Sequence, residues 1–397
     1  MTKAKLFDVG VVGGGVVGCA VAYYLSKAGL SVVILEKEHV CSGASNANQG
    51  GIAVQVFDLK TIPITLASLG LYRELSEELD FDIEYRPHGT LNVARNPYQV
   101  PLLKRRCEEL IHLGMNVRLW NEHQLRSFPG GDAEPFLSVC ESPQDAQVNP
   151  LKVTYALALG AKRLGATIMP YAPVAQIKTD KKAIHSVVLK GGEEIVCGRV
   201  VCAAGAWSKE IGRLVGIDIP VDPQRGQLLI TERVERAEYP YILDADYLTS
   251  AYGIKPEGED EAARIRSRMG IGASYSQELP GNWTIGASRD MVGFVRTNSP
   301  EVLRQVAKYF LELMPWMKRV NCIRFIAGYR PYCVKDGHPI LGRVPDVTGF
   351  YLATGHAGEG VALAPITGKL ISEEITTGKT SFPLDDFRYE RFSSSRS

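Results

Sequence analysis

A glycine-rich motif near the N-terminus constrains the fold of this chain more than any other feature. Residues 13–18 read Gly-Gly-Gly-Val-Val-Gly, a match to G-x-G-x-x-G. The motif follows a short apolar segment, residues 7–12, and opens a segment typical of a helix, residues 18–28. A second apolar and β-branched segment, residues 30–35, ends at Glu36. Together these segments predict a complete β-α-β unit of the dinucleotide-binding type.

Each glycine of the motif has a separate physical task in such a unit. Gly13 permits the tight turn, Gly15 lets the backbone approach a pyrophosphate, and Gly18 lets the helix pack close to the sheet. The free N–H groups at the helix start, around Val16 and Val17, form an anion site because the helix dipole is positive there. The motif therefore predicts a bound dinucleotide rather than an empty turn.

The acidic residue after the second strand limits which dinucleotide binds. We expect Glu36 to accept hydrogen bonds from the adenosine ribose hydroxyls, and Lys37 to lie beside the cofactor. The Glu36 carboxylate would repel the extra phosphate of NADP, so it argues against that cofactor. It does not distinguish NAD from FAD.

Length, charge and cysteine spacing limit the number of domains and the kinds of ligand that we expect. The 397 residues exceed one comfortable hydrophobic core, so two structural domains are expected. A formal net charge of +1 gives no electrostatic case for nucleic acid. None of the eight cysteines forms a C-x-x-C pair, so we expect no metal site and reduced thiols in the cytoplasm. The apolar residues 9–22 are too short to span a bilayer. Peripheral association at the inner face of the membrane stays open.

The pattern along the chain predicts how the two domains are connected. Buried-strand signals at residues 199–204 and 350–354 resemble those of the N-terminal unit, whereas residues 227–231 and 283–286 alternate as in an antiparallel sheet. The charged segment 257–268 is predicted to be an exposed loop or hairpin tip. We therefore expect an α/β fold with a discontinuous Rossmann-like domain that binds the dinucleotide, which the segments below indicate to be FAD, and an inserted α+β antiparallel-sheet substrate domain. The predicted boundaries are 1–82, 145–222 and 326–397 for the first domain, and 83–144 and 223–325 for the second.

Three further segments rich in small residues favour FAD over NAD. Residues 42–51 form a polar loop just after the acidic strand, and residues 201–208 form a strand that ends in small residues before a helix. Residues 355–360 form a glycine loop that leads into a third helix, whose N-terminus would face the electron-rich edge of a reduced flavin. A nicotinamide dehydrogenase would leave these later segments without a task.

On these motifs the chain resembles the D-amino-acid oxidase-type FAD-dependent oxidoreductases, the superfamily of glycine oxidase, sarcosine oxidase and related amine dehydrogenases. The matching segments are 11–18 with Glu36, 43–51, 201–208, 223–227, 328–331, 336–342 and 355–367. Residues 281–289 and 292–294 resemble the flavin subunits of multi-subunit amine dehydrogenases that act on proline, hydroxyproline, opines or sarcosine. No spacing around His39 or Cys333 matches covalent attachment, so we expect FAD to be non-covalent.

The resemblance also implies which residues contact the cofactor. These expected contacts are Gly13, Gly15, Val16, Val17, Gly18, Glu36, Lys37, Ser42, Ala44, Ser45, Gln49, Gly50, Gly51, Val174, Ala204, Gly205, Trp207, Gly226, Arg330, His356, Gly358, Glu359 and Gly360.

The resemblance further implies that Arg330 binds the substrate carboxylate, because a guanidinium fork matches a carboxylate in bidentate fashion. Glycine oxidase-like members have a second arginine in the loop that matches residues 355–360, whereas this chain has Glu359 there. We therefore expect Tyr252 or Tyr275 to assist Arg330. Glu359 either meets a cationic amine or is a solvent-facing acid at a helix N-terminus. His356 either hydrogen-bonds the isoalloxazine, acts as a base, or only packs.

The expected reaction is oxidation of a small amino acid or secondary amine to the imine, by hydride transfer to flavin N5. Proline, hydroxyproline, sarcosine, glycine and D-amino acids are the substrate types considered. One alternative is a 2-hydroxy-acid dehydrogenase, in which His356 takes the hydroxyl proton. Another is a flavin subunit that is inactive alone. The expected partners are the substrate and either a companion electron-transfer subunit or further copies of the chain.

Overall fold

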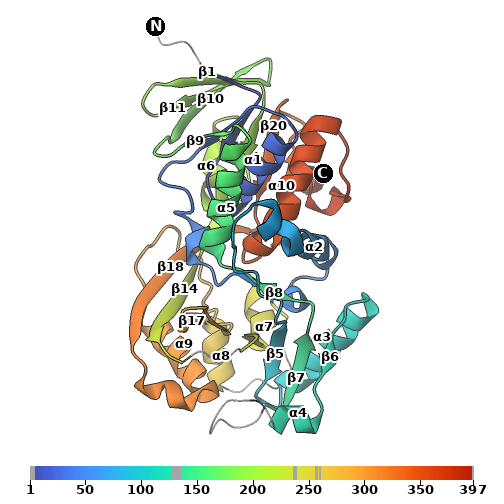
Figure 1. The fold of residues 1–397 in the computed structure, drawn as a ribbon, viewed down its shortest axis with the longest axis vertical. Helices are drawn as coiled ribbons and strands as arrows, with labels where there is room; N and C mark the ends of the chain where they lie inside the picture. The colour runs from blue at the N-terminus through green and yellow to red at the C-terminus, as the bar shows by residue number, and fades with distance from the viewer. Residues whose placement is uncertain are drawn as a thin grey trace.

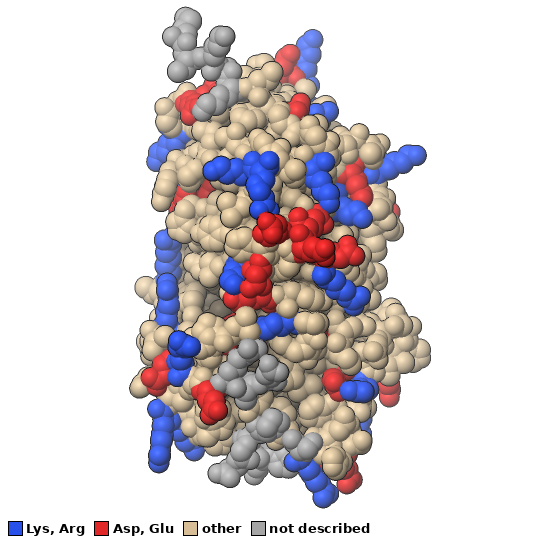
Figure 2. Space-filling view, viewed as in Figure 1, with Lys and Arg blue, Asp and Glu red and all other residues tan. Residues whose placement is uncertain are grey.

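The computed structural model describes residues 5–126, 128, 136–235, 239–254, 258 and 261–395. The molecule is elongated, with a six-stranded and a four-stranded sheet at one end and an eight-stranded sheet at the other (Figure 1). Lys and Arg side chains are interspersed with Asp and Glu on the face drawn in Figure 2, as the near-zero net charge suggests.

The six-stranded sheet is the dinucleotide-type sheet that the sequence predicts. Its neighbouring strands are parallel except at one edge, where β19 is antiparallel to β20. In spatial order the strands are β19 (Ile340–Arg343), β20 (Phe350–Thr354), β13 (Val200–Cys202), β2 (Val9–Val12), β3 (Val32–Leu35) and β9 (Thr167–Met169). Strands β2, β3 and β13 are wholly buried and apolar because both faces of the sheet are covered.

Helices cover one face of this sheet, and a small mixed sheet covers the other. The covering helices are α1 (Val16–Lys27), α2 (Ile62–Glu78), α5 (Pro150–Arg163) and α10 (Gly360–Thr377). Helix α6 (Ser208–Arg213) follows β13 and packs on the other side through Ile211. The second layer consists of β1 (Lys5–Phe7), β12 (Glu194–Cys197), β11 (Ala183–Leu189) and β10 (Val174–Asp180). Each face of the six-stranded sheet has its own hydrophobic core. Side chains along β3 alternate between them: Ile34 packs in the core beneath the helices, and Val33 packs in the core beneath the small sheet.

The eight-stranded sheet is antiparallel except between β15 and β5. Its strands are, in order, β18 (Cys322–Cys333), β14 (Val221–Arg233), β17 (Asn282–Gly286), β16 (Ser274–Gln277), β15 (Tyr241–Asp244), β5 (Thr90–Ala94), β7 (Ser138–Ser142) and β6 (Arg118–Leu119). Its helices are α3 (Gln99–His112), α4 (Glu122–Arg126), α7 (Asp246–Tyr252), α8 (Glu261–Arg268) and α9 (Pro300–Leu313). A short pair, β4 (Gly51–Ile52) with β8 (Ala146–Gln147), completes the strands of the described chain.

Short 3-10 helices lie at Ala44–Ala47, Val54–Val56, Gly205–Trp207, Pro315–Arg319, Asp385–Phe387 and Tyr389–Ser395. No helix in the described part of the chain is both long and apolar enough to cross a membrane.

The predicted fold class is confirmed, and one local prediction is wrong. Residues 261–268, predicted to be a loop or hairpin tip, form α8, while residues 257, 259 and 260 of that segment lie outside the described residues. The helix forms because Arg266 is nearly buried, where its guanidinium pairs with Asp246 at 3.1 Å and lies 4.2 Å from the Tyr309 ring centroid. That tertiary ion pair is not visible in a charged stretch of sequence.

The predicted domain boundaries stay a proposal. β14 and β18 pair along their whole length, from Val221 opposite Cys333 to Thr231 opposite Cys322, and the proposed boundary at 325/326 falls inside β18. This continuous two-stranded ribbon links the region of the eight-stranded sheet to the rest of the molecule, so a side chain on it can face both.

Candidate active site

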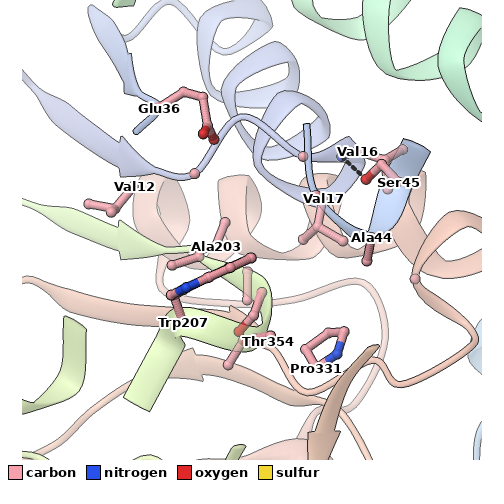
Figure 3. A pocket seen from close by; sticks show the side chains of 18 of the residues that line it. Val12, Val16, Val17, Glu36, Ala44, Ser45, Ala203, Trp207, Pro331 and Thr354 are labelled. Carbon is pink, nitrogen blue, oxygen red and sulfur yellow. Dashed lines mark hydrogen bonds between the residues drawn. The ribbon is translucent and has the colours of Figure 1, made fainter. Parts of the chain in front are cut away.

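A cavity of about 240 Å³ lies at the carboxyl ends of the parallel strands β2, β3, β13 and β20 (Figure 3). Ligands of open α/β sheets bind at this edge. Most of the expected cofactor residues line it: Gly13, Gly15, Val16, Val17, Glu36, Lys37, Ser42, Ala44, Ser45, Val174, Ala204, Gly205, Trp207, His356 and Gly360.

The glycine motif has the geometry of a phosphate site. Gly13 has φ +113°, and a Cβ there would overlap the Ala203 backbone. The Val16 N–H donates to Ser45 Oγ at 3.0 Å, while the first turn of α1 has no acidic side chain that would neutralise the helix dipole (Figure 3). Gly18 does not line the cavity; a Cβ there would overlap the Gly13 carbonyl. Its task is close packing, as the motif predicts.

The far end of the cavity is polar. The Glu36 carboxylate accepts from the Gly14 N–H at 2.7 Å and from the Glu38 N–H at 2.8 Å, which holds it at the end of β3. A carboxylate has acceptor capacity beyond these two bonds, so ribose hydroxyls can still donate to it. Lys37 Nζ lies 3.2 Å from the Trp207 ring centroid, and burial lowers the pKa of this lysine.

A second, smaller cavity of about 60 Å³ adjoins the first, because both are lined by Ala44, Asn48, Tyr329 and Ala357. Arg330 lines it, donating from Nη1 to the Ser288 carbonyl at 2.9 Å. Burial, together with the charge of Arg289, lowers the pKa of Arg330 to about 10, so the guanidinium remains a cation at neutral pH. A Cβ at Gly226 would overlap this guanidinium, which explains why a glycine stands there.

The remaining loop residues hold the two sheets together. Gln49 lines the second cavity with Gly51, and its Nε2 donates to the Ser274 and Thr284 carbonyls at 3.0 and 2.9 Å. Gly50 lines none of the three described cavities; it has φ +73°, and a Cβ there would overlap the Val148 carbonyl. This part of the loop therefore positions the eight-stranded sheet against the first cavity.

His356 is buried at the first cavity and neutral. Its Nε2 lies 3.1 Å from Thr367 Oγ1, and burial lowers its pKa to about 3. Such an imidazole accepts a proton poorly near pH 7. Of its three expected roles, that of a base is the least supported.

A third cavity, of about 330 Å³, is lined by Tyr252, Gly358 and Glu359. The Tyr252 hydroxyl donates to Glu359 Oε1 at 2.8 Å. Glu359 is only 6% exposed, so its interpretation as a solvent-facing acid is wrong. Burial raises the pKa of its carboxyl to about 7, although the Tyr252 hydrogen bond opposes this rise.

Tyr275 lies outside these cavities, contrary to its expected place beside the substrate. Its ring is 1% exposed and packs 5.0 Å from the Phe310 ring of α9. Adjacent side chains of a strand point to opposite faces, so Ser274 lines the second cavity and Tyr275 points into the core. The expectation for Tyr275 is corrected on this ground.

A comparison with protein families identifies the family of this chain. The model of the family described as FAD dependent oxidoreductase matches residues 8–374. The chain belongs to this family. FAD is therefore its cofactor. Three features fit that dinucleotide: the glycine motif, the hydrogen bond from the Val16 N–H to Ser45 Oγ, and the Glu36 carboxylate at the end of β3. The non-covalent attachment stays a prediction.

Individual relatives of the family cover nearly the whole chain. Glycine oxidase of Geobacillus kaustophilus is 29% identical over 97% of each sequence. Mitochondrial dimethylglycine dehydrogenase of Mus musculus is 27% identical over 96% of this chain, which spans 44% of that longer protein. Among solved structures, L-proline dehydrogenase of P. horikoshii superposes with a TM-score of 0.86 at 26% identity, covering 98% of this chain and 99% of that one.

Tyr247 and Arg289 are among the cavity-lining residues that sequence reasoning missed. Tyr247 lines both the second and the third cavity from α7, and no motif marks it. Arg289 lines the third cavity and lies at the end of segment 281–289, whose resemblance to amine dehydrogenases was the available signal. Neither could be assigned from spacing, because both reach the site through tertiary contacts with distant strands.

Proposed function

We propose that this FAD-dependent oxidoreductase oxidises a small amino acid or secondary amine to its imine, with Arg330 binding the substrate carboxylate. The observation that supports this most directly is a half-buried guanidinium in a cavity that adjoins the FAD cavity. Within the described residues, no carboxylate lies at ion-pair distance from Arg330. Partial removal of a cation from water without an ion-pair partner is unfavourable, so an anionic ligand is the expected partner of Arg330.

In this reaction the side chains mainly position the substrate and exclude water. FAD, when bound, supplies the hydride acceptor. Arg330 orients the carboxylate, and the enclosed cavity walls exclude water from a neutral amine. Amine oxidation of this kind requires no side-chain base. This favours an amine over a 2-hydroxy acid, whose hydroxyl proton needs a base that the low pKa of His356 makes weak. The names of the three relatives above also denote enzymes that act on amino acids.

Anaerobic flavin bleaching tests the proposal. The yellow protein is mixed without oxygen with L-proline, D-proline, hydroxyproline, sarcosine, glycine, D-alanine or 2-hydroxyglutarate. We expect one or more of the amines to reduce the flavin, and Arg330→Lys to weaken substrate binding because lysine lacks the bidentate fork. Bleaching by the hydroxy acid alone would contradict the proposal. Admission of air then separates an oxidase, which recolours rapidly, from a dehydrogenase.

A second candidate function is that of a flavin subunit in a multi-subunit amine dehydrogenase. Four apolar side chains of one loop are exposed: Met291 (52%), Val292 (42%), Phe294 (42%) and Val295 (43%). Phe294 stacks on Trp207 of the FAD cavity, with ring centroids 4.8 Å apart. Clustered apolar exposure of this kind is typical of an interaction site. Substrate-dependent flavin reduction by the chain alone, with fast turnover on an artificial electron acceptor, would argue against dependence on a partner.

A further inference from the structure

The third cavity is an extension of the second. Tyr247, Ala357 and Gly358 line both, so a ligand held at Arg330 has a polar compartment beside it. The second cavity, of about 60 Å³, has room for little more than a small amino-acid core, whereas the third measures about 330 Å³. Glycine or sarcosine would leave that compartment without a ligand group.

Arg289 is the cation of this compartment. Its guanidinium lies 4.4 Å from the Tyr247 ring centroid, and Nη1 donates to Ser250 Oγ at 2.9 Å. No carboxylate of the described residues forms an ion pair with it. A guanidinium has five N–H donors, so most of its fork remains available to a ligand. The cavities of Arg289 and Arg330 share a wall at Tyr247, Ala357 and Gly358, so the two cations line adjoining cavities. The charge of Arg289 also contributes to the lowered pKa of Arg330.

The carboxyl groups that line the compartment already have hydrogen-bond or ion-pair partners, and burial raises the pKa of one of them, Glu359, to about 7. Asp336 pairs with Arg391 at 2.7 Å, and Asp58 Oδ1 accepts from the Lys60 N–H at 2.9 Å. The buried Glu359 carboxyl accepts a hydrogen bond from Tyr252. Arg289 is therefore a cation that a ligand in this compartment can pair with, because no carboxylate of the described residues already does so.

We propose that Arg289 and the third cavity form a second anion subsite. It binds a second carboxylate of the substrate, carried either by the side chain on Cα or by the substituent on the amine nitrogen. The substrate class is then a dicarboxylic amino acid or an N-(carboxyalkyl) amino acid, with one carboxylate on Arg330 and the other on Arg289. This inference rests on the proposed function for the oxidation step, but the anion subsite itself is measurable by binding.

The binding test uses two ligands of equal length that differ at one end, glutarate and pentanoate. Each is titrated into the holoenzyme, and the shift of the flavin absorbance gives Kd. We expect glutarate to bind at least tenfold more tightly than pentanoate. Arg289→Gln should bring the ratio of the two Kd values close to one while leaving the Kd of pentanoate within twofold. Arg289→Lys, which keeps the charge but not the fork, should retain an intermediate ratio.

The matched control is Arg324→Gln on the exposed part of β18, which should leave both Kd values unchanged. Equal affinity for the two ligands in the wild-type enzyme would overturn the subsite, as would a glutarate preference that survives in Arg289→Gln. Flavin absorbance and melting temperature verify that each variant is folded and loaded.

An oxidation test separates this inference from the proposed function. Anaerobic flavin reduction is compared between glutamate and norvaline, each as both enantiomers, and between N-(2-carboxyethyl)glycine and N-propylglycine. We expect the dicarboxylic member to be the better substrate of at least one pair, and only that member to be sensitive to Arg289→Gln. If amines reduce the flavin with no dicarboxylate preference, the subsite fails and the proposed function stands. If glutarate binds as expected but no amine reduces the flavin, the proposed function fails and the subsite stands.

Discussion

The glycine opposite the substrate-binding arginine offers the sharpest perturbation of this site. In Gly226→Ala, the new Cβ would overlap Nη1, Cζ and Nη2 of Arg330, so the guanidinium must move away from β14. This movement breaks its hydrogen bond to the Ser288 carbonyl and misaligns the fork. A charge-assisted hydrogen bond contributes about 1.5–3 kcal/mol. If the misaligned fork loses about 1.5–3 kcal/mol of binding free energy to the substrate carboxylate, the Kd of the substrate rises roughly 10- to 150-fold.

Stopped-flow flavin reduction without oxygen measures this effect, because the dependence of the rate on substrate concentration separates Kd from the limiting rate. The control is Gly198→Ala, where a Cβ meets nothing within 4 Å and φ is not positive. It should leave Kd unchanged. If Gly226→Ala binds FAD normally and its Kd stays within twofold of the wild-type value, the assignment of Arg330 to the carboxylate is refuted.

Three further predictions concern single residues. His356→Gln should lower the limiting rate of flavin reduction by an amine less than about tenfold, since the imidazole is already neutral; a loss above roughly 100-fold would instead indicate an essential base. Tyr275→Phe should leave Kd and the limiting rate unchanged and cost no stability on denaturant unfolding, because the buried hydroxyl has no hydrogen-bond partner in the described chain. Glu359→Gln should flatten the pH dependence of the free energy of unfolding, by about 2–3 kcal/mol between pH 5 and pH 8.

The sign of that last effect follows from the raised pKa of Glu359, about 7 against an ordinary 4.5. The folded protein binds the proton more tightly than the unfolded chain, so the stabilising contribution is complete below pH 4.5 and is lost as the pH rises through 7. Urea titrations of both proteins, with excess FAD present, measure the difference. Parallel pH profiles for wild type and variant would show that Glu359 is ionised in the folded state across this range.

The sequence by itself determined the features that depend on local backbone geometry. The turn at Gly13 needs a positive φ, the start of α1 needs a glycine for close approach, and Glu36 follows a strand of buried apolar residues. These constraints act within some thirty residues, so spacing alone predicts them. The antiparallel segments within β14 and β17 were predicted for the same reason, since period-2 alternation is a local property of a strand.

Only the tertiary structure decided which side chains meet. Ser274 and Tyr275 are adjacent in sequence, yet strand register sends the first to the cavity and the second to the core. The Glu359 carboxylate accepts a hydrogen bond from Tyr252 of a distant helix, and Arg289 lines a cavity that shares a wall with the cavity of Arg330. Burial, pKa and charge proximity arise from contacts between segments far apart in the chain. Local patterns do not encode such contacts, so most of the first cavity's expected residues could be predicted from the sequence, whereas Tyr247 and Arg289 of the third cavity could not.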